Sequence, residues 1–320
     1  ISLGLVGSEM CIRDSGAADA EAAIAAARWT FPSWSMTTPA ERGEVLRAIL
    51  AVYEARAADM AEAISTEMGA PIDMALSDQA GAGRSHLKAF IRALDAFEWQ
   101  RPMRPGTEGQ DLVFEAAGVA GLITPWNWPM NQVVLKVGAA LAAGCTMVLK
   151  PSEIAPMSSI LFAEIMHEAG VPAGVFNMVN GDGPGVGTIL SSHPDIDVVS
   201  FTGSTRAGIL ISKAAADTVK TVSLELGGKS PNLVFNDTDI DAAVARGASF
   251  CFANTGQSCN AATRMLVERD AYERAVEVAA ATAEATVVDL PSKSGGHIGP
   301  LVSQVQFDKV QSLIQAGIDE

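Results

Sequence analysis

The chain has 320 residues, of which 48% are hydrophobic and 18% charged, enough for two globular domains and unlike a disordered chain. Its formal net charge of −15 would repel a phosphate backbone, so we expect no nucleic-acid partner. No apolar run reaches the roughly 18 residues that a transmembrane helix needs, so we expect no membrane association.

Both ends of the chain have unusual sequences. Residues 1–15 show neither strand alternation nor a helical stripe, and they lack the features of a secretory signal. We interpret them as a leader foreign to the fold. Residues 315–320 stop inside a predicted helix without a C-cap glycine, so we expect a truncated fragment.

The first hundred residues predict helices. Residues 16–31 are rich in alanine and helical in pattern. Thr38, a proline at the next position and Glu41 form a capping-box start, and the helix that follows is expected to run to Met68. A further helix is predicted over residues 77–97.

Short apolar strands alternate with helices after a Pro- and Gly-rich loop at residues 101–109. This alternation predicts an α/β fold with a Rossmann-type parallel sheet covered on both faces. The expected strands are 119–124, 146–150, 175–179, 197–203 and 221–226. Such sheets bind ligands at the carboxyl ends of their strands. A second α/β region follows, with strands expected at 232–237 and 265–268 and helices ending near 252 and 285.

Cys259 is the candidate nucleophile. It lies in the small, polar loop 256–264, and a cysteine is reactive when part of it is thiolate near neutral pH. The alternative is a buried structural thiol, which is how we interpret Cys251. The four cysteines lack CxxC or disulfide spacing, and no His/Cys cluster has metal-ligand spacing. We therefore expect a cytoplasmic protein without a metal site.

Two further residues have side chains suited to catalysis. Glu225 ends an apolar strand before two glycines, and a partly desolvated glutamate can act as a general base. The alternative is an exposed glutamate at a strand end. Asn127, between prolines and tryptophans, can donate its amide to an oxyanion, or it can form an Asx turn.

Three other loops at strand ends suit a nucleotide. Ser204, after Gly203, opens a helix whose amides can hold a pyrophosphate, although a plain N-cap is the alternative. The loop 180–187 is rich in glycine but departs from the strict Rossmann fingerprint. Lys150 and Glu153 can reach ribose hydroxyls or remain surface charges.

The motifs PWNWP, KPSE, FTGST, ELGGKSP and GQSCNAATR, in this order, resemble the aldehyde dehydrogenase superfamily. The resemblance extends over about residues 17–320, and the spacing of 34 residues from Glu225 to Cys259 also matches. It implies a cofactor domain over residues 16–226, with a bridging hairpin at about 98–117. Residues 227–320 would be the N-terminal part of a catalytic domain.

The resemblance implies oxidation of a small-molecule aldehyde to a carboxylic acid with NAD+ or NADP+. Cys259 would form a thiohemiacetal and then a thioester, Asn127 would hold the oxyanion, and Glu225 would activate the hydrolytic water. The aldehyde itself is not specified by the sequence, although Trp128, Met130, Val134 and Ser258 are expected to line its tunnel, which suggests a medium-sized pocket without a charge clamp.

The resemblance also implies which residues line the cofactor site. Lys150 and Glu153 would lie at the adenosine ribose and Ser204 at the pyrophosphate. A carboxylate at position 153 favours NAD over NADP, because it would repel a 2′-phosphate. The implied cofactor residues are Thr124, Pro125, Trp126, Lys150, Ser152, Glu153, Gly183, Gly187, Phe201, Thr202, Gly203, Ser204 and Leu226.

The chain departs from the family pattern at both ends. The N-terminal strand pair before residue 17 and the Glu-Ile-Phe-Gly-Pro segment after residue 320 are not in this sequence. We therefore expect the chain alone to fold poorly or to be inactive, and the complete protein to be a homodimer or homotetramer. The alternatives are a CoA-acylating semialdehyde dehydrogenase, against which Glu225 argues, a cysteine hydrolase, and an inactive relative or fragment.

Overall fold

A five-stranded sheet forms the centre of the computed structural model, which describes residues 15–106 and 109–320. Its strands run in the order β5-β4-β3-β6-β7, and all four pairings are parallel. The strands are β3 (Val119–Ile123), β4 (Thr146–Lys150), β5 (Phe176–Met178), β6 (Val198–Gly203) and β7 (Thr221–Leu226). The predicted parallel α/β fold is confirmed, and every strand ends at the same edge of the sheet.

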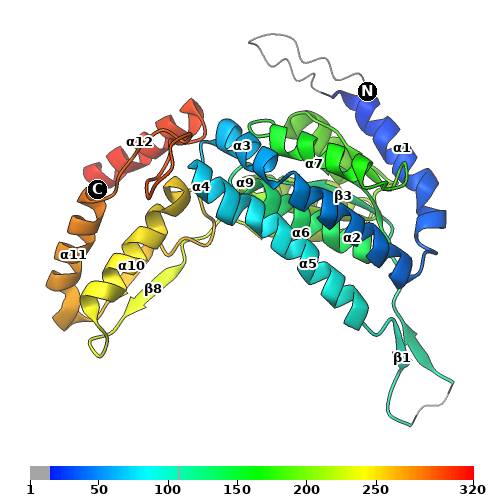
Figure 1. Ribbon diagram of the computed structural model, residues 1–320, viewed down its shortest axis with the longest axis horizontal. Helices are drawn as coiled ribbons and strands as arrows, with labels where there is room; N and C mark the ends of the chain where they lie inside the picture. Colours follow the sequence, from blue (N-terminus) through cyan, green and yellow to red (C-terminus); the bar gives the residue numbers. More distant parts are fainter. Residues whose placement is uncertain (1–14, 107–108) are drawn as a thin grey trace.

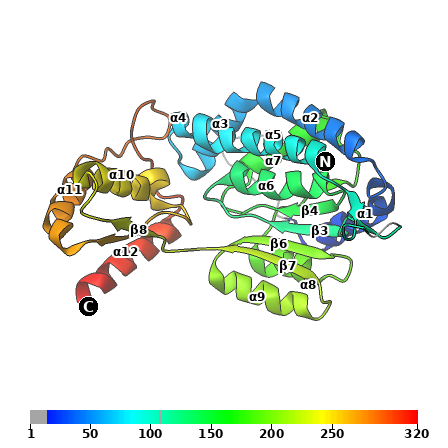
Figure 2. The ribbon, with the colours of Figure 1, turned by 90° about the horizontal axis from the view of Figure 1, so that it is seen from below.

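Helices cover both faces of this sheet (Figures 1 and 2). On one face α6 and α7 lie beneath α2, α3 and α5, and on the other lie α1, α8 and α9. Their bounds are α1 (Ala17–Trp34), α2 (Pro39–Ala55), α3 (Ala57–Met68), α5 (Gly81–Ala96), α6 (Pro129–Ala142), α7 (Met157–Glu168), α8 (Thr188–Ser192) and α9 (Thr205–Ala216).

Alternate side chains of the buried strands supply two separate cores. Leu122 of β3 and Leu149 of β4 belong to the core beneath α6 and α7. Ile123 and Val148, their neighbours in sequence, belong to the core beneath α1 and α8. The strands are therefore apolar at nearly every position, as expected for a sheet covered on both faces.

The N-terminal helices differ in detail from the prediction. Thr38 and Glu41 form the predicted capping box, with the Glu41 amide donating to Thr38 Oγ1 at 3.2 Å and the Thr38 amide to Glu41 Oε2 at 2.7 Å. The expected single helix to Met68 is broken at Arg56, whose φ and ψ of −106° and 20° separate α2 from α3. The expected helix from residue 77 begins instead with a π-helical turn, η1 (Ala75–Ala80). A short helix, α4 (Ile72–Met74), precedes it.

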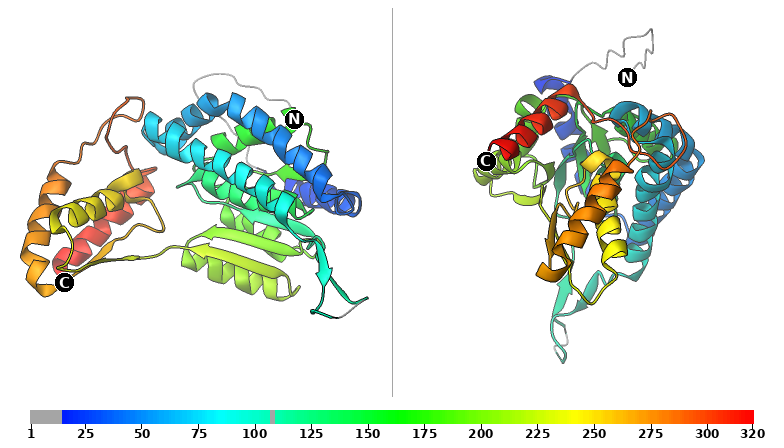
Figure 3. Two further views of the ribbon diagram at one scale, coloured as in Figure 1. Left: turned by 60° about the horizontal axis from the view of Figure 1, so that its bottom comes forward. Right: turned by 90° about the vertical axis from the view of Figure 1, so that its left-hand side faces the viewer.

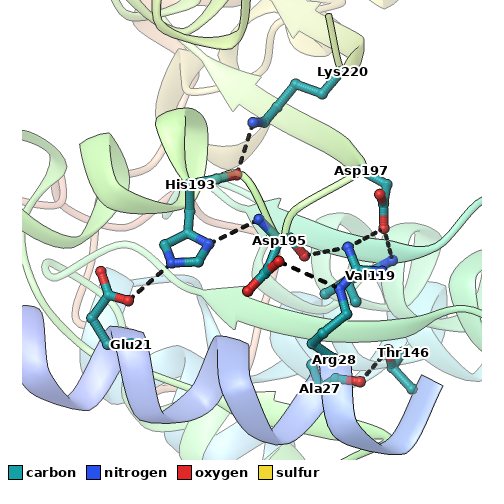
Figure 4. Close-up of polar contacts among 9 residues, drawn as sticks. All are labelled: Glu21, Ala27, Arg28, Val119, Thr146, His193, Asp195, Asp197 and Lys220. Atoms are coloured by element: carbon teal, nitrogen blue, oxygen red, sulfur yellow. Dashed lines mark hydrogen bonds and ion pairs between the residues drawn. The ribbon is translucent and has the colours of Figure 1, made fainter. Parts of the chain in front are cut away.

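A polar cluster fixes α1 to the amino edge of the sheet, opposite the strand exits (Figure 4). Arg28 Nη2 donates to Asp197 Oδ2 at 2.7 Å, and the same oxygen accepts the Val119 amide at 2.7 Å. His193 Nε2 lies 2.9 Å from Glu21 Oε2. Gly118, with φ +126°, has no room for a side chain because a Cβ there would overlap the Asp197 carboxylate.

A two-stranded hairpin projects from the body of the molecule (Figure 1). Its strands, β1 (Gln100–Pro102) and β2 (Asp111–Val113), are antiparallel. At its base the ring of Phe97 packs edge-on against Trp99 and Phe114, with centroids 4.8 and 5.1 Å apart.

The last ninety residues form a second, smaller unit at one end of the molecule (Figure 3). A parallel pair of strands lies beside α10 and α11, and the buried core between them consists of Val234, Val244 and Ala275 among the described residues. Its elements are β8 (Pro231–Val234), α10 (Ile240–Phe252), the 3-10 turn η3 (Ala253–Gly256), β9 (Arg264–Val267), η4 (Arg269–Ala271), α11 (Tyr272–Glu284) and α12 (Gln304–Asp319). None of the described helices is both long and apolar enough to cross a membrane.

Candidate active site

The strand exits of the large sheet gather the sequence motifs at one edge. Because β3 to β7 are parallel, the segments that follow them (124–128, 151–156, 179–187, 204 and 227–230) share this edge. The predicted leader 1–15 has only Ser15 among the described residues. It is paired with Asn180 in one of these segments, through the Ser15 amide to Asn180 O at 3.1 Å.

An unusual backbone precedes Cys259. After α10, Asn254 and Thr255 have φ of 52° and 57°, and Gly256 has φ of 71°, so three successive residues are left-handed. Non-glycine residues hold this conformation only where their surroundings enforce it. The side-chain Nδ2 of the buried Asn254 donates to Asn127 O at 2.9 Å, and Gln257 Nε2 donates to Asn254 O at 3.1 Å. Cys259 itself is exposed.

Asn127 and Trp128 attach the loop after β3 to the cysteine loop. Asn127 Nδ2 donates to Gln257 O at 2.8 Å, and Trp128 Nε1 donates to Ser258 Oγ at 2.9 Å. These bonds end one residue before Cys259. The Asn127 side chain therefore lies beside the cysteine loop, where one amide proton is engaged and a second remains to be donated.

Gln79, which the sequence analysis missed, lies behind this junction. It belongs to the π turn η1 and is fully buried. Its Nε2 donates to Asn127 O at 3.2 Å and lies 3.5 Å from Asn254 Oδ1, while its Oε1 has no partner among the described residues. The same amide thus contacts both loops of the site. A π turn is frequent at functional sites, but no sequence signal announces one.

The end of β7 approaches the cysteine loop through Gly228. A Cβ at Gly228 would lie 3.1 Å from the carbonyl oxygen of Cys259, so this position favours a residue without a side chain. Just beyond, the Arg264 amide donates to Ser230 O at 3.3 Å as the two segments continue into β8 and β9. The structure therefore places the strand that carries Glu225 and the cysteine loop side by side.

Glu225 is exposed, and the expectation of a partly desolvated carboxylate is not met in this structure. The reason is topological. β7 is the outermost strand of the sheet, and its side chains alternate between exposed and half-buried positions.

Lys136 is a buried cation near Glu225 that sequence reasoning passed over. It lies on α6, is 9% exposed, and its Nζ donates to Ser200 Oγ at 2.9 Å. Burial lowers the pKa of Lys136 to about 8, and the Glu225 carboxylate opposes this shift. The sequence signal available was that Lys136 is the single charged residue of α6.

Two hydroxyl groups without partners mark the exits of the central strands. Thr124 Oγ1 and Thr202 Oγ1 are buried and make no hydrogen bond among the described residues. They are neighbours, because Ile123 of β3 pairs with Phe201 of β6. The sheet changes winding direction here, between β3 and β6, which is where such folds bind nucleotides. Unpaired buried hydroxyls are costly unless a ligand satisfies them.

The start of α9 lies beside these hydroxyls. Ser204 caps the helix, with its Oγ accepting the Ala207 amide at 3.2 Å. The predicted alternative of an N-cap is thus observed, and it leaves the other first-turn amides available to an anion. Gly203 lies over the ring of Phe201, and a Cβ at position 203 would overlap that ring. The buried Phe201 side chain therefore packs beneath the strand exit.

Lys150 and Glu153 form an ion pair at the end of β4. Lys150 is 2% exposed, and its Nζ donates to Pro151 O at 2.8 Å and to Glu153 Oε2 at 3.1 Å. Glu153 is exposed at the same edge. Gly187 covers the Lys150 stem, since a Cβ there would lie 3.9 Å from Lys150 Cδ.

The remaining predicted cofactor residues are distributed along the same edge. Pro125 and Trp126 are half-buried, Ser152 is buried, Gly183 is exposed at the start of the π turn η2 (Gly183–Gly187), and Leu226 is half-buried. All the predicted positions therefore lie on β3 to β7 or in the segments that follow them.

Comparisons with known proteins agree on one family. A profile of the aldehyde dehydrogenase family matches residues 9–320. The chain is 50% identical over 299 residues to a 3-succinoylsemialdehyde-pyridine dehydrogenase from a Pseudomonas species, covering 93% of this chain and 62% of that protein.

Solved structures show the same likeness. An aldehyde dehydrogenase from Bartonella henselae matches with a TM-score of 0.94 and 56% identity, covering 96% of this chain and 64% of that one. A cysteine-to-alanine variant of aldehyde dehydrogenase C from Pseudomonas syringae, in complex with NAD+ and octanal, matches with a TM-score of 0.92 and 46% identity, covering 95% and 62%. The chain thus spans slightly less than two thirds of the length of these relatives.

Proposed function

The chain belongs to the aldehyde dehydrogenase family, and we propose that its protein oxidises an aldehyde to a carboxylic acid with NAD+ through a covalent intermediate on Cys259. One observation carries this proposal. The Gly228 backbone lies against the Cys259 carbonyl, which brings the strand of Glu225 beside the nucleophile. The Asn127 side chain, hydrogen-bonded to Gln257 O, lies beside the same loop.

Cys259 begins the reaction in this proposal. Its thiolate attacks the aldehyde carbon and forms a C–S bond, giving a thiohemiacetal oxyanion. Asn127 donates its remaining amide proton to that oxyanion, and its rigid attachment to Gln257 supports this role. Bound NAD+ supplies the two-electron acceptor that this oxidation requires, and the enzyme is left as a thioester.

Glu225 completes the cycle by taking a proton from water. The resulting hydroxide attacks the thioester carbon, the C–S bond breaks, and the carboxylic acid leaves while the thiol is regenerated. The exposure of Glu225 gives water access to it, and its carboxylate opposes the lowering of the pKa of the buried Lys136.

The cofactor edge supports NAD+ as the acceptor. The hydroxyls of Thr124 and Thr202, which have no partner in the part of the chain that the structure describes, and the first-turn amides of α9 suit the hydroxyl and phosphate oxygens of a dinucleotide. The Lys150–Glu153 pair suits a ribose diol, since lysine donates and the carboxylate accepts. A 2′-phosphate would meet the Glu153 carboxylate, so we propose NAD+ over NADP+.

The named relatives and the exposed hairpin bear on the substrate class and the assembly. One relative is named for a pyridine semialdehyde and another was solved with octanal, so we propose a medium-sized apolar or aromatic aldehyde as the substrate.

The hairpin 98–117 presents exposed Met103, Leu112 and Val113, which supports a homo-oligomer in the complete protein. A cytoplasmic setting would keep the exposed Cys259 reduced.

The test follows NADH absorbance with the full-length gene product at saturating NAD+. Octanal, benzaldehyde and an aryl semialdehyde form the substrate panel, with a Cys259→Ala variant as the control. We expect NADH formation that falls by at least about a thousandfold in the variant. A folded protein that binds NAD+ yet oxidises none of these aldehydes, or a variant as active as the wild type, would contradict the proposal. Turnover that requires CoA would identify the acylating alternative.

A further inference from the structure

Glu67, near the end of α3, carries a carboxylate that the proposed mechanism does not use. Its Oε2 accepts the Met157 amide at 2.5 Å and the Ser158 amide at 3.2 Å, and its Oε1 accepts the Ser158 hydroxyl. These amides belong to the first turn of α7. The carboxylate is therefore the cap of a helix that lies about ninety residues away along the chain.

The cap is needed because α7 cannot provide its own. Its N-cap residue is Pro156, which has no side-chain acceptor and makes no capping hydrogen bond. The first-turn amides of a helix otherwise lack partners, and an anion at this end also interacts favourably with the helix dipole. Glu67 supplies both from another helix.

The Glu67 carboxyl is buried in this contact. Burial has the largest effect on its pKa, which it raises to about 7, although the hydrogen bonds from Ser158 and Met157 lower that pKa. A second contact sets the orientation of the two helices. Arg56, at the start of α3, pairs with Glu164 and Glu168 of α7 at 3.1 and 2.8 Å. The helix α3 is thus fixed to α7 at both ends.

The capped turn directly follows the loop at the end of β4. Four residues separate Ser152 from Met157, and the loop is held at its other end by Lys150, whose Nζ donates to Pro151 O at 2.8 Å. Inside the loop only short-range bonds are found among the described contacts, such as the Ala155 amide to Ser152 O at 3.2 Å. Its position therefore depends on its two anchors.

We propose that Glu67 is a positioning residue for the adenosine-ribose end of the cofactor site, acting through the start of α7 to hold Ser152 and Glu153 in place. This inference rests on the proposed function, which assigns that ribose to the same loop. Glu67 does not touch the reacting atoms near Cys259, so its loss should weaken cofactor binding and spare the chemical step.

The experiment compares Glu67→Met, which removes both acceptor oxygens, with Glu67→Gln, which keeps one acceptor for the amides and a donor for Ser158. Glu62→Met, exposed on the same helix, is the matched control. Dissociation constants for NAD+ and for AMP, which carries only the adenosine half, are measured by fluorescence quenching, beside kcat in the full-length protein. A milder Ser158→Ala variant, which removes one bond of the cap, serves if Glu67→Met does not fold.

We expect Glu67→Met to raise the Kd of NAD+ and AMP together by roughly tenfold, with kcat within about twofold. Glu67→Gln and Glu62→Met should stay near the wild type, and Ser158→Ala should raise both Kd values by roughly threefold. A Glu67→Met variant that loses kcat at unchanged Kd, or a folded Ser158→Ala variant with unchanged Kd, would overturn the inference. A wild type that binds neither NAD+ nor AMP would overturn the proposed function as well.

Discussion

Gly227 and Gly228 are adjacent residues with different surroundings, and the pair tests the approach of β7 to the cysteine loop. A Cβ at Gly228 would lie 3.1 Å from Cys259 O, whereas one at Gly227 meets nothing within 4 Å. We predict that Gly228→Ala displaces the cysteine loop and lowers kcat by about tenfold, because a small displacement of the nucleophile slows the reaction strongly. Steady-state NADH formation measures it, with Gly227→Ala as the control. Equal losses in both variants would contradict the close approach as the cause.

Lys136 carries a pH dependence whose sign is determined by its pKa. The folded protein releases this proton near pH 8, while an unfolded lysine keeps it to its ordinary pKa of 10.5. Between these values the unfolded state binds more protons, so the free energy of unfolding rises with pH. Relative to Lys136→Met, the wild type should gain on the order of 3 kcal/mol over this range, and no gain should occur below pH 8.

Urea denaturation at several pH values measures this difference. Lys213→Met, on the exposed face of α9, is the control for a lysine removed without burial. Wild-type and Lys136→Met stabilities that run parallel from pH 7 to pH 10 would show that Lys136 titrates as an ordinary exposed lysine.

At the scale of elements, the π turn η1 determines where Gln79 lies. The extra residue in the turn directs the Gln79 amide at Asn127 O and Asn254 Oδ1. We predict that Gln79→Leu leaves these buried acceptors underpaired, destabilises the fold by about 1 kcal/mol and lowers kcat about tenfold. The KM for NAD+ should change little, because the network lies at the cysteine end of the site.

Kinetics and thermal denaturation of Gln79→Leu provide the measurement, beside Leu76→Ala from the same turn, whose side chain is half exposed. A variant that unfolds earlier but keeps its kcat would assign Gln79 to stability alone.

The elements also show how far sequence reasoning reaches. The strands, their parallel order and the loops at their carboxyl ends follow from apolar runs and strand-to-helix alternation, as the β3 and β6 exits illustrate. Bonds between distant segments do not follow, because no local pattern encodes them. Glu67 caps α7 from another helix, and the left-handed Asn254 is held by Asn127. Glu225 was expected to be partly desolvated, but burial depends on the outer position of β7, which local sequence does not specify.

At the scale of the whole molecule, apolar burial is distributed unevenly. The large sheet and its helices hold two extensive cores, whereas the described residues after 230 contribute three fully buried apolar side chains to the third. Many large apolar side chains of this second unit are exposed, among them Leu233, Phe235, Leu313 and Ile318. Stability that scales with buried apolar area should therefore differ between the two units.

We predict that the unit after residue 230 opens first in the 320-residue chain. Hydrogen exchange followed by mass spectrometry should show faster exchange in β8, β9 and α12 than in β3, β4 and β6, since local opening costs least where few apolar contacts are lost. Limited proteolysis should cut after Leu226 before it cuts the large sheet, which also tests the predicted boundary between residues 226 and 227. Equal protection of β4 and β9, or first cleavage within α6 or α7, would mean that the two units unfold as one cooperative body.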